Sequence, residues 1–257
     1  MDKRLTTFKR LLDIMDELRE KCPWDRKQTF ESLRNLTIEE TYELADAISR
    51  NNPDDIKGEL GDLLLHIVFY SKIGSEIKEF DISDVAEAIN SKLISRHPHV
   101  FGDTDAANEE EVKQNWEHLK IQESDRNVLS GVPSSLPALI KANRIQDKVR
   151  GVGFDWEEQH QIWDKVMEEI SELRDEIDKH ESKKVEAEFG DLFFSLVNAA
   201  RLYGVDPENA LEKTNQKFMK RFGYLEEKTI KAGKSLKEMS LDEMNVIWEE
   251  AKQFDKK

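Results

Sequence analysis

The sequence predicts an all-α protein built from two tandem helical-bundle modules. Apolar residues recur at helical spacing, neither half shows the alternating pattern of paired β-strands, and one acidic pattern occurs twice. The composition, with 36% charged residues, 11 glycines and 6 prolines in 257 residues, also favours a helix-rich chain. A stretch rich in Gly, Pro and Ser separates the halves. We therefore expect an N-terminal module at 1–123, a linker at 124–137 and a C-terminal module at 138–257.

The first half is expected to hold four helices. Spacing of apolar residues indicates the first, which ends before a Cys-Pro-Trp turn. Thr37, with Glu40 three residues later, is expected to form a capping box for the second, and Asp54 or Asp55 to cap the third. Ser83 is expected to begin the fourth. The expected ranges are 5–19, 37 to about 51, about 54 through 69, and 83–97.

The order of elements recurs in the second half. A helix at 139–149 leads to a Gly-rich loop at 151–156, and long helices follow near 158–180 and 183–203. Pro207 stands at the favoured first position of the next helix. Ser240 and Glu243 form a capping box for the last.

Charge and cysteine content exclude several classes of protein. The net charge of −15 disfavours binding to nucleic acid or to a membrane surface, because both are anionic. Cys22 is the only cysteine, so neither an internal disulfide nor a thiolate zinc site can form. The start of the chain lacks a signal-peptide pattern and no apolar segment is long enough to span a membrane. We expect a cytoplasmic protein.

The repeated acidic pattern is the most informative feature. Acidic residues are 54 of the 257, so a single Glu-x-x-Glu is most often a solvated helix face. Here, however, each acid of the second set lies 129 residues after its partner (168 − 39 and 191 − 62). Two copies in register indicate a duplicated site. The sets are Glu39, Glu40, Glu43, Glu59 and Asp62, and Glu168, Glu169, Glu172, Glu188 and Asp191.

The spacing of these acids predicts a metal site. Within each set two pairs stand at i, i+3, each pair on one helix face, and a short turn can fold the two helices antiparallel. Two carboxylates about 4 Å apart repel by about 4 kcal/mol at an effective dielectric constant of 20, so converging acids need a counter-charge. Hard oxygen ligands suit Mg²⁺, with Mn²⁺ as a substitute. A di-iron bundle would need Glu-x-x-His on two helices, and only Glu157 with His160 fits.

The pattern resembles the MazG family of all-α nucleoside triphosphate pyrophosphohydrolases. The resemblance rests on EETYE with ELGD and on EEISE with EFGD, and extends to CPWDRKQT, SRHPHVFGD and VGFDW. It implies Mg²⁺-dependent cleavage of NTPs or dNTPs at the α–β linkage to the monophosphate and pyrophosphate, in a helical protein that usually forms a homodimer. The implied metal ligands are Glu169, Glu172, Glu188 and Asp191, with Glu40, Glu43, Glu59 and Asp62 as first-module equivalents.

Positive side chains in the second half are expected to hold the triphosphate. Lys217, Lys220 and Arg221 stand at i, i+3, i+4 on one helix, and their KFMKRF segment is similar to a phosphate-binding stretch of the family. Two further family phosphate positions fall on Lys165 and Lys184. In the first half the corresponding positions are poorer in cations: Lys92, Ser95 and Arg96 replace the KFMKRF cations, and Leu36 and Asp55 replace the two lysines.

The position of the nucleoside also favours the C-terminal module as the catalyst. Ser195 and Asn198 leave room where the first module carries bulky His66 and Phe69, and Asn198 can hydrogen-bond a sugar or base edge. The resemblance makes Trp248 a base-stacking residue, which implies a broad range of bases because every base has a π face. The N-terminal module is then structural, regulatory or specialised for another nucleotide.

The expected mechanism is attack of water at the α–β linkage without a covalent intermediate. Glu168, next to the metal ligands in sequence, either orients or deprotonates that water, or contacts the ligands without touching the metal or the water. Two non-enzymatic functions remain open: a nucleotide sensor without turnover, and an acidic helical interaction module whose carboxylates face a basic partner.

Overall fold

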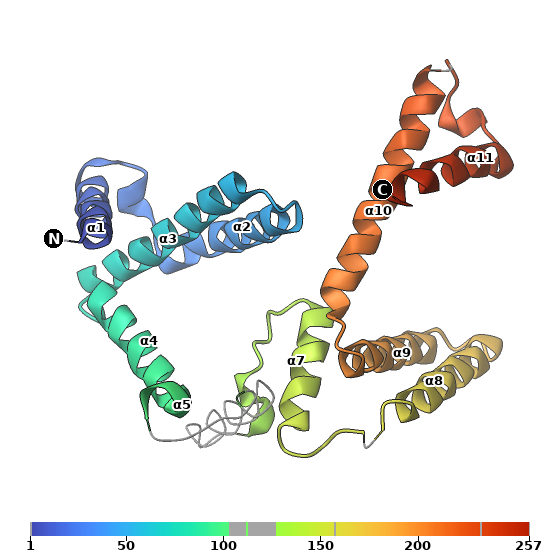
Figure 1. Ribbon diagram of the computed structural model, residues 1–257, viewed down its shortest axis with the longest axis horizontal. Coiled ribbons are helices and arrows are strands. Elements are labelled where there is room, and N and C mark those ends of the chain that lie inside the picture. The colour runs from blue at the N-terminus through green and yellow to red at the C-terminus, as the bar shows by residue number, and fades with distance from the viewer. Residues whose placement is uncertain (1, 103–111, 113–126, 157, 232, 257) are drawn as a thin grey trace. The chain divides into compact units, whose positions relative to one another are not determined.

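The computed structural model describes residues 2–102, 112, 127–156, 158–231 and 233–256. Within these ranges the chain forms helices and no β-strand, which confirms the all-α prediction. It divides into two compact units, Met1–Val112 and Lys113–Lys257 (Figure 1). The expected linker at 124–137 lies partly outside the described residues, and its described portion contains a short 3₁₀ helix, η2 at Val128–Gly131.

The first unit is organised around a pair of packed helices. Its elements are α1 at Lys3–Lys21, η1 at Asp25–Lys27, α2 at Phe30–Ser49, α3 at Pro53–Glu76, α4 at Ile82–Arg96 and α5 at Pro98–Phe101. A tight turn joins α2 to α3, so the two helices run antiparallel side by side (Figure 1). The core of this unit consists of buried side chains from α1, α2 and α3: Met15, Leu33, Val68, Phe69 and Ile73.

Three of the predicted helix starts in this unit are wrong. Helix α2 begins earlier than expected because Thr29 and Ser32 form the capping box, and nothing between them and Thr37 interrupts the helix. Thr37 therefore lies inside α2. Asn52 caps α3 in place of the aspartates, accepting a hydrogen bond from the Asp54 amide at 3.2 Å, and Asp81 caps α4 just before Ser83.

The second unit repeats the packed pair. After η2 come α7 at Ala138–Arg150, α8 at Gln161–Asp178, α9 at Ser182–Leu202, α10 at Pro207–Lys231, η3 at Leu236–Glu238, α11 at Leu241–Ala251 and η4 at Lys252–Lys256. Helices α8 and α9 are antiparallel neighbours joined by a short turn, with α7 packed against α9 (Figure 1). The capping box of Ser240 and Glu243 at the start of α11 is confirmed.

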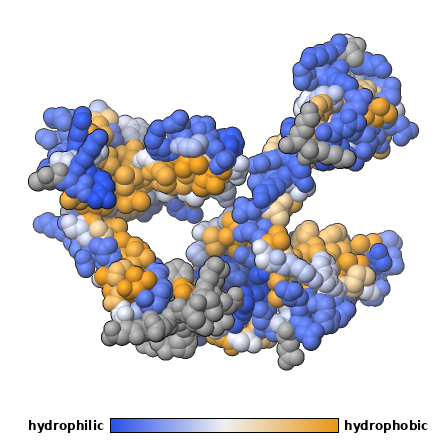
Figure 2. Space-filling model, viewed as in Figure 1, coloured by the Kyte–Doolittle hydropathy of each residue, from blue (hydrophilic) through white to orange (hydrophobic). Residues whose placement is uncertain are grey.

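Both units carry apolar side chains on their surfaces (Figure 2). In the first unit these include Ile89 and Leu93 on α4, and in the second Phe193 on α9 and Met219 on α10. In the described ranges, every helix is either too short or too polar to cross a bilayer.

Candidate metal and nucleotide site

Three of the predicted metal ligands of the second unit converge between α8 and α9. Carboxylate oxygens of Glu169, Glu172 and Glu188 all lie within 4.8 Å of one another. Glu169 is buried, Glu188 half-buried and Glu172 exposed, so the cluster opens from the helix interface to the surface. Asp191 follows Glu188 by one helical turn and its charge acts on that residue. We call these four residues the C-terminal cage.

The C-terminal cage carries more negative charge than its surroundings neutralise. The pKa of Glu188 is raised, first by loss of solvation and then by the charges of Glu172 and Asp191. Lys165 supplies part of the counter-charge, since its Nζ lies 2.7 Å from Glu169 and 3.1 Å from Glu168. These hydrogen bonds, that to Glu169 being the stronger, raise the pKa of Lys165.

The first unit contains an equivalent cluster, the N-terminal cage. Oxygens of Glu40, Glu43 and Glu59 lie within 4.8 Å of one another between α2 and α3. Loss of solvation raises the pKa of Glu40, and the next contribution comes from Asp62. Each cage thus offers carboxylate oxygens alone, from two helices, with charge that remains to be neutralised. This donor set fits Mg²⁺ or Mn²⁺.

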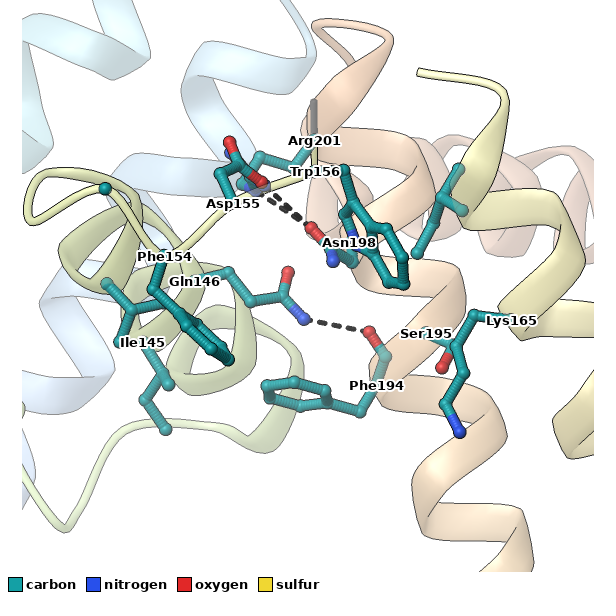
Figure 3. Close-up of a pocket in the computed structure, with 13 residues that line it drawn as sticks. Ile145, Gln146, Phe154, Asp155, Trp156, Lys165, Phe194, Ser195, Asn198 and Arg201 are labelled. Carbon is teal, nitrogen blue, oxygen red and sulfur yellow. Dashed lines mark hydrogen bonds and ion pairs between the residues drawn. The ribbon is translucent and has the colours of Figure 1, made fainter. Parts of the chain in front are cut away.

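A cavity of about 460 Å³ lies in the second unit (Figure 3). Helices α7, α8 and α9 and the loop at 151–156 form its wall, and Lys165 lines it as well as contacting the cage. Ser195 and Asn198 stand four and seven residues after Asp191, on the same face of α9. Lys165 therefore links the cavity to the cage.

The cavity wall is fixed by an ion-pair network. Arg201 binds the carboxylate of Asp155, from the loop, with Nη1 at 3.1 Å from Oδ2. The same guanidinium donates to Oδ1 of Asn198, from Nε at 3.1 Å and from Nη2 at 2.8 Å (Figure 3). Asn198 is thus held with its carbonyl oxygen occupied.

In the first unit the corresponding space is filled. Phe69, at the position of Asn198, is a core residue with 2% of its surface exposed, and Arg19 lies over its ring at 5.5 Å. His66, at the position of Ser195, is buried and lies 2.8 Å from the Thr37 hydroxyl, which also lies 2.7 Å from the Tyr70 hydroxyl. The steric contrast expected from the sequence is present in the structure.

The predicted phosphate and base contacts occupy two places. Lys165 and Asn198 line the cavity, and Lys184 stands one helical turn before Glu188 on α9, with its Nζ 2.8 Å from Glu181. The other group lies on a different helix pair, α10 and α11, where Lys217 and Lys220 are exposed. The ring centroids of Trp248 and Phe218 are 5.0 Å apart, and the guanidinium carbon of Arg221 lies 5.6 Å from the centroid of the Trp248 ring. The nucleotide roles of both groups stay predictions.

Sequence reasoning missed most of the cavity wall. Gln146, Phe154, Asp155, Trp156 and Arg201 line it, yet only the loop residues gave a signal, as part of a motif without an assigned role. Glu157, of the di-iron alternative, lies outside the described residues.

The all-α architecture and the repeated acidic clusters define a tandem helical protein with a carboxylate cluster in each module. The chain belongs to the MazG nucleotide pyrophosphohydrolase family, whose domain model matches residues 28–101 and 157–224. This confirms the family resemblance and the expectation of an enzyme of this class.

Several relatives are similar over nearly the whole chain. The nucleoside triphosphate pyrophosphohydrolase of Escherichia coli K12 is 43% identical over 252 residues, covering 95% of this chain and 96% of that protein. The nucleoside triphosphate pyrophosphohydrolase/pyrophosphatase MazG of Thermotoga maritima is 45% identical over 253 residues, covering 96% of each. YabN of Bacillus subtilis is 44% identical over 257 residues, which are 97% of this chain but 52% of that protein.

Proposed function

We propose that the protein is a Mg²⁺-dependent nucleoside triphosphate pyrophosphohydrolase that cleaves NTPs and dNTPs at the α–β linkage, with catalysis in the C-terminal module. The observation that carries the proposal is a carboxylate cage and a nucleoside-sized cavity in the second unit that share the side chain of Lys165. The relatives of nearly equal length that bear this activity in their names support it.

Glu169, Glu172, Glu188 and Asp191 would hold the metal. When bound, Mg²⁺ neutralises phosphate charge and lowers the pKa of a coordinated water. Oxygens of Glu169, Glu172 and Glu188 already converge, which supports a metal site that needs little rearrangement of the helices.

In this proposal Glu168 receives the proton of the attacking water. It lies on α8 beside the cage, exposed to solvent, with Lys165 bound to one of its oxygens at 3.1 Å. A carboxylate in this position orients the attacking water toward the α-phosphorus and accepts its proton. Lys165 holds Glu168 and Glu169 in place until a phosphate oxygen competes for its ammonium group.

The remaining cations act on the leaving pyrophosphate. Lys184 beside the cage, and Lys217, Lys220 and Arg221 on α10, stabilise the negative charge that develops on the leaving group. The rings of Phe154, Trp156 and Phe194 in the cavity wall supply faces on which any base can stack, which favours a broad base range. No nucleophilic side chain is required, because water is the nucleophile.

The N-terminal module has a structural or regulatory role in this proposal. It keeps a metal cage, but Phe69 and His66 fill the space that holds the nucleoside in its counterpart. Apolar side chains exposed on both units, Phe193 and Leu93 among them, support assembly as a homodimer.

The proposal is tested by incubating the purified protein with each NTP and dNTP and Mg²⁺, then resolving monophosphate, diphosphate and pyrophosphate. We expect monophosphate and pyrophosphate in equal amounts, and no product with EDTA. A nucleotide sensor would instead show nucleotide-induced stabilisation without pyrophosphate. An interaction module would show no response to Mg²⁺.

A further inference from the structure

Gln146 carries a buried polar atom that is unpaired within the described part of the chain. The side chain projects from α7 into the cavity wall and is 3% exposed. Its Nε2 donates to the carbonyl oxygen of Phe194 at 2.9 Å, while Oε1 is buried and has no hydrogen-bond partner among the described residues. A buried acceptor left unpaired costs about 1–3 kcal/mol, so its retention calls for a physical reason.

The polarity of this amide is fixed. The Phe194 carbonyl can only accept, so the nitrogen of Gln146 must face it and the oxygen must point the other way. Figure 3 shows this arrangement, with the Gln146 oxygen turned away from Phe194. Asn198 is fixed in the opposite sense, because Arg201 occupies its Oδ1 and leaves its Nδ2 as the donor. The cavity therefore presents one oriented acceptor and one oriented donor.

The rest of the wall suits a flat, apolar-faced ligand. Phe154, Trp156 and Phe194 contribute aromatic rings, and Ile145 and Ile162 contribute aliphatic side chains. Asn198 lies seven residues beyond Asp191 on α9, about 10 Å along the helix. An occupant whose phosphates meet the cage thus extends its other end toward Gln146 and Asn198.

We propose that Oε1 of Gln146 accepts a hydrogen bond from an N–H group on the edge of the substrate's nucleobase, while Asn198 donates to an adjacent base acceptor. This inference rests on the proposed function and specifies how its substrate is selected. Adenine and cytosine offer an amino group beside a ring nitrogen, and guanine and uracil offer a ring N–H beside a carbonyl. All four satisfy the amide pair, but a base without such an N–H leaves Gln146 unpaired.

The test compares nucleotides that differ by one amino group. ATP is paired with purine riboside 5′-triphosphate, and CTP with the triphosphate of 2-pyrimidinone riboside, with kcat/KM for pyrophosphate release as the readout. Because a site built to pair a polar group rejects an analogue that lacks it, we expect the wild-type enzyme to prefer the amino-bearing member by about 10-fold or more. Gln146→Met should remove the preference by lowering kcat/KM for ATP and CTP toward the values for their analogues.

Two controls separate recognition from folding. Inorganic tripolyphosphate has no base, so its inhibition constant should be the same for the wild type and Gln146→Met. Equal loss with tripolyphosphate would overturn the inference, as would a wild type that treats both members of each pair alike, or a Met variant that keeps the preference. The wild-type comparison needs no variant and stands even where Gln146→Met folds poorly.

Calorimetric binding of α,β-methylene-ATP and its purine riboside counterpart keeps this inference distinct from the proposed function. Discrimination in binding without pyrophosphate release would refute the enzymatic proposal and support the role of Gln146. Pyrophosphate release without discrimination between the two nucleotides would support the enzymatic proposal and refute the role of Gln146.

Discussion

Replacing Glu172 by Gln tests whether the C-terminal cage is held under electrostatic strain that a cation relieves. Glu172 is one of three carboxylates with oxygens within 4.8 Å of one another. Two unit charges at that distance repel by about 3.5 kcal/mol at an effective dielectric constant of 20. Glu172 is exposed, so water screens the net effect to about 1 kcal/mol. Without metal, the variant's second unit should melt about 4 °C higher than that of the wild type.

With magnesium the order should reverse. At a concentration 100 times its Kd, a bound cation stabilises the native state by about 2.7 kcal/mol, which raises the melting temperature of a module this size by about 10 °C. Loss of a direct ligand should weaken Mg²⁺ binding at least about 100-fold, because mutation of residues that only hydrogen-bond to metal ligands already lowers metal affinity by about 10–100-fold. At the same magnesium concentration the stabilisation then falls to about 0.4 kcal/mol.

The assay is differential scanning calorimetry with EDTA and with Mg²⁺, together with pyrophosphate release. The matched control is Glu43→Gln, at the same place in the N-terminal cage, which should change the melting of the first unit and leave turnover intact. A Glu172→Gln variant that melts lower in EDTA and responds to Mg²⁺ like the wild type would refute the electrostatic reasoning. Loss of turnover in Glu43→Gln alone would show that catalysis was assigned to the wrong module.

Three further predictions concern charged groups around the sites. Lys165→Met should tighten Mg²⁺ binding in titrations without nucleotide, because the ammonium group that lies 2.7 Å from Glu169 no longer competes with the cation for that carboxylate. The same variant should raise KM for ATP. An unchanged Kd for Mg²⁺ together with an unchanged KM would contradict this. Lys217→Ala should raise KM several-fold without changing the melting temperature, whereas the first-module counterpart Lys92→Ala should leave KM unaltered. The hydrogen bond from Arg19 lowers the pKa of Glu76, so its contribution of about 1 kcal/mol is present above the ordinary glutamate pKa and is lost as pH falls through the lowered pKa. The melting temperature of Glu76→Gln should therefore differ from that of the wild type at pH 7 and approach it as acid protonates Glu76.

The sequence predicted the helices and cages well because both depend on local spacing. Helices α8 and α9 lie within a few residues of their expected bounds, and the i, i+3 acids place their oxygens together once two neighbouring helices pair. The start of α2 was misjudged because Thr29 and Thr37 offer equally good caps in the sequence, and only the core decides between them. Thr37 is held inside the helix by His66 and Tyr70, from α3.

Gln146 and Arg201 could not be predicted in the same way. The partner of Gln146 is the Phe194 carbonyl, 48 residues away, and that of Arg201 is Asp155, 46 residues away. Neither pair has a periodic signature, because each depends on how α7 and its following loop pack against α9.

The duplication separates the requirements of metal binding from those of nucleoside binding. Both units keep three converging glutamates, but only in the first do Phe69 and His66 fill the space next to them. Three convergent carboxylates repel one another even where no nucleoside fits beside them, so the proposed function predicts that a cation bound in the first unit would stabilise the helix pair itself. Magnesium should therefore stabilise both units, whereas α,β-methylene-ATP should add stability to the second alone. If the nucleotide analogue protected both units equally in calorimetry, the closed space around Phe69 would have to open, and the division of roles between the modules would be wrong.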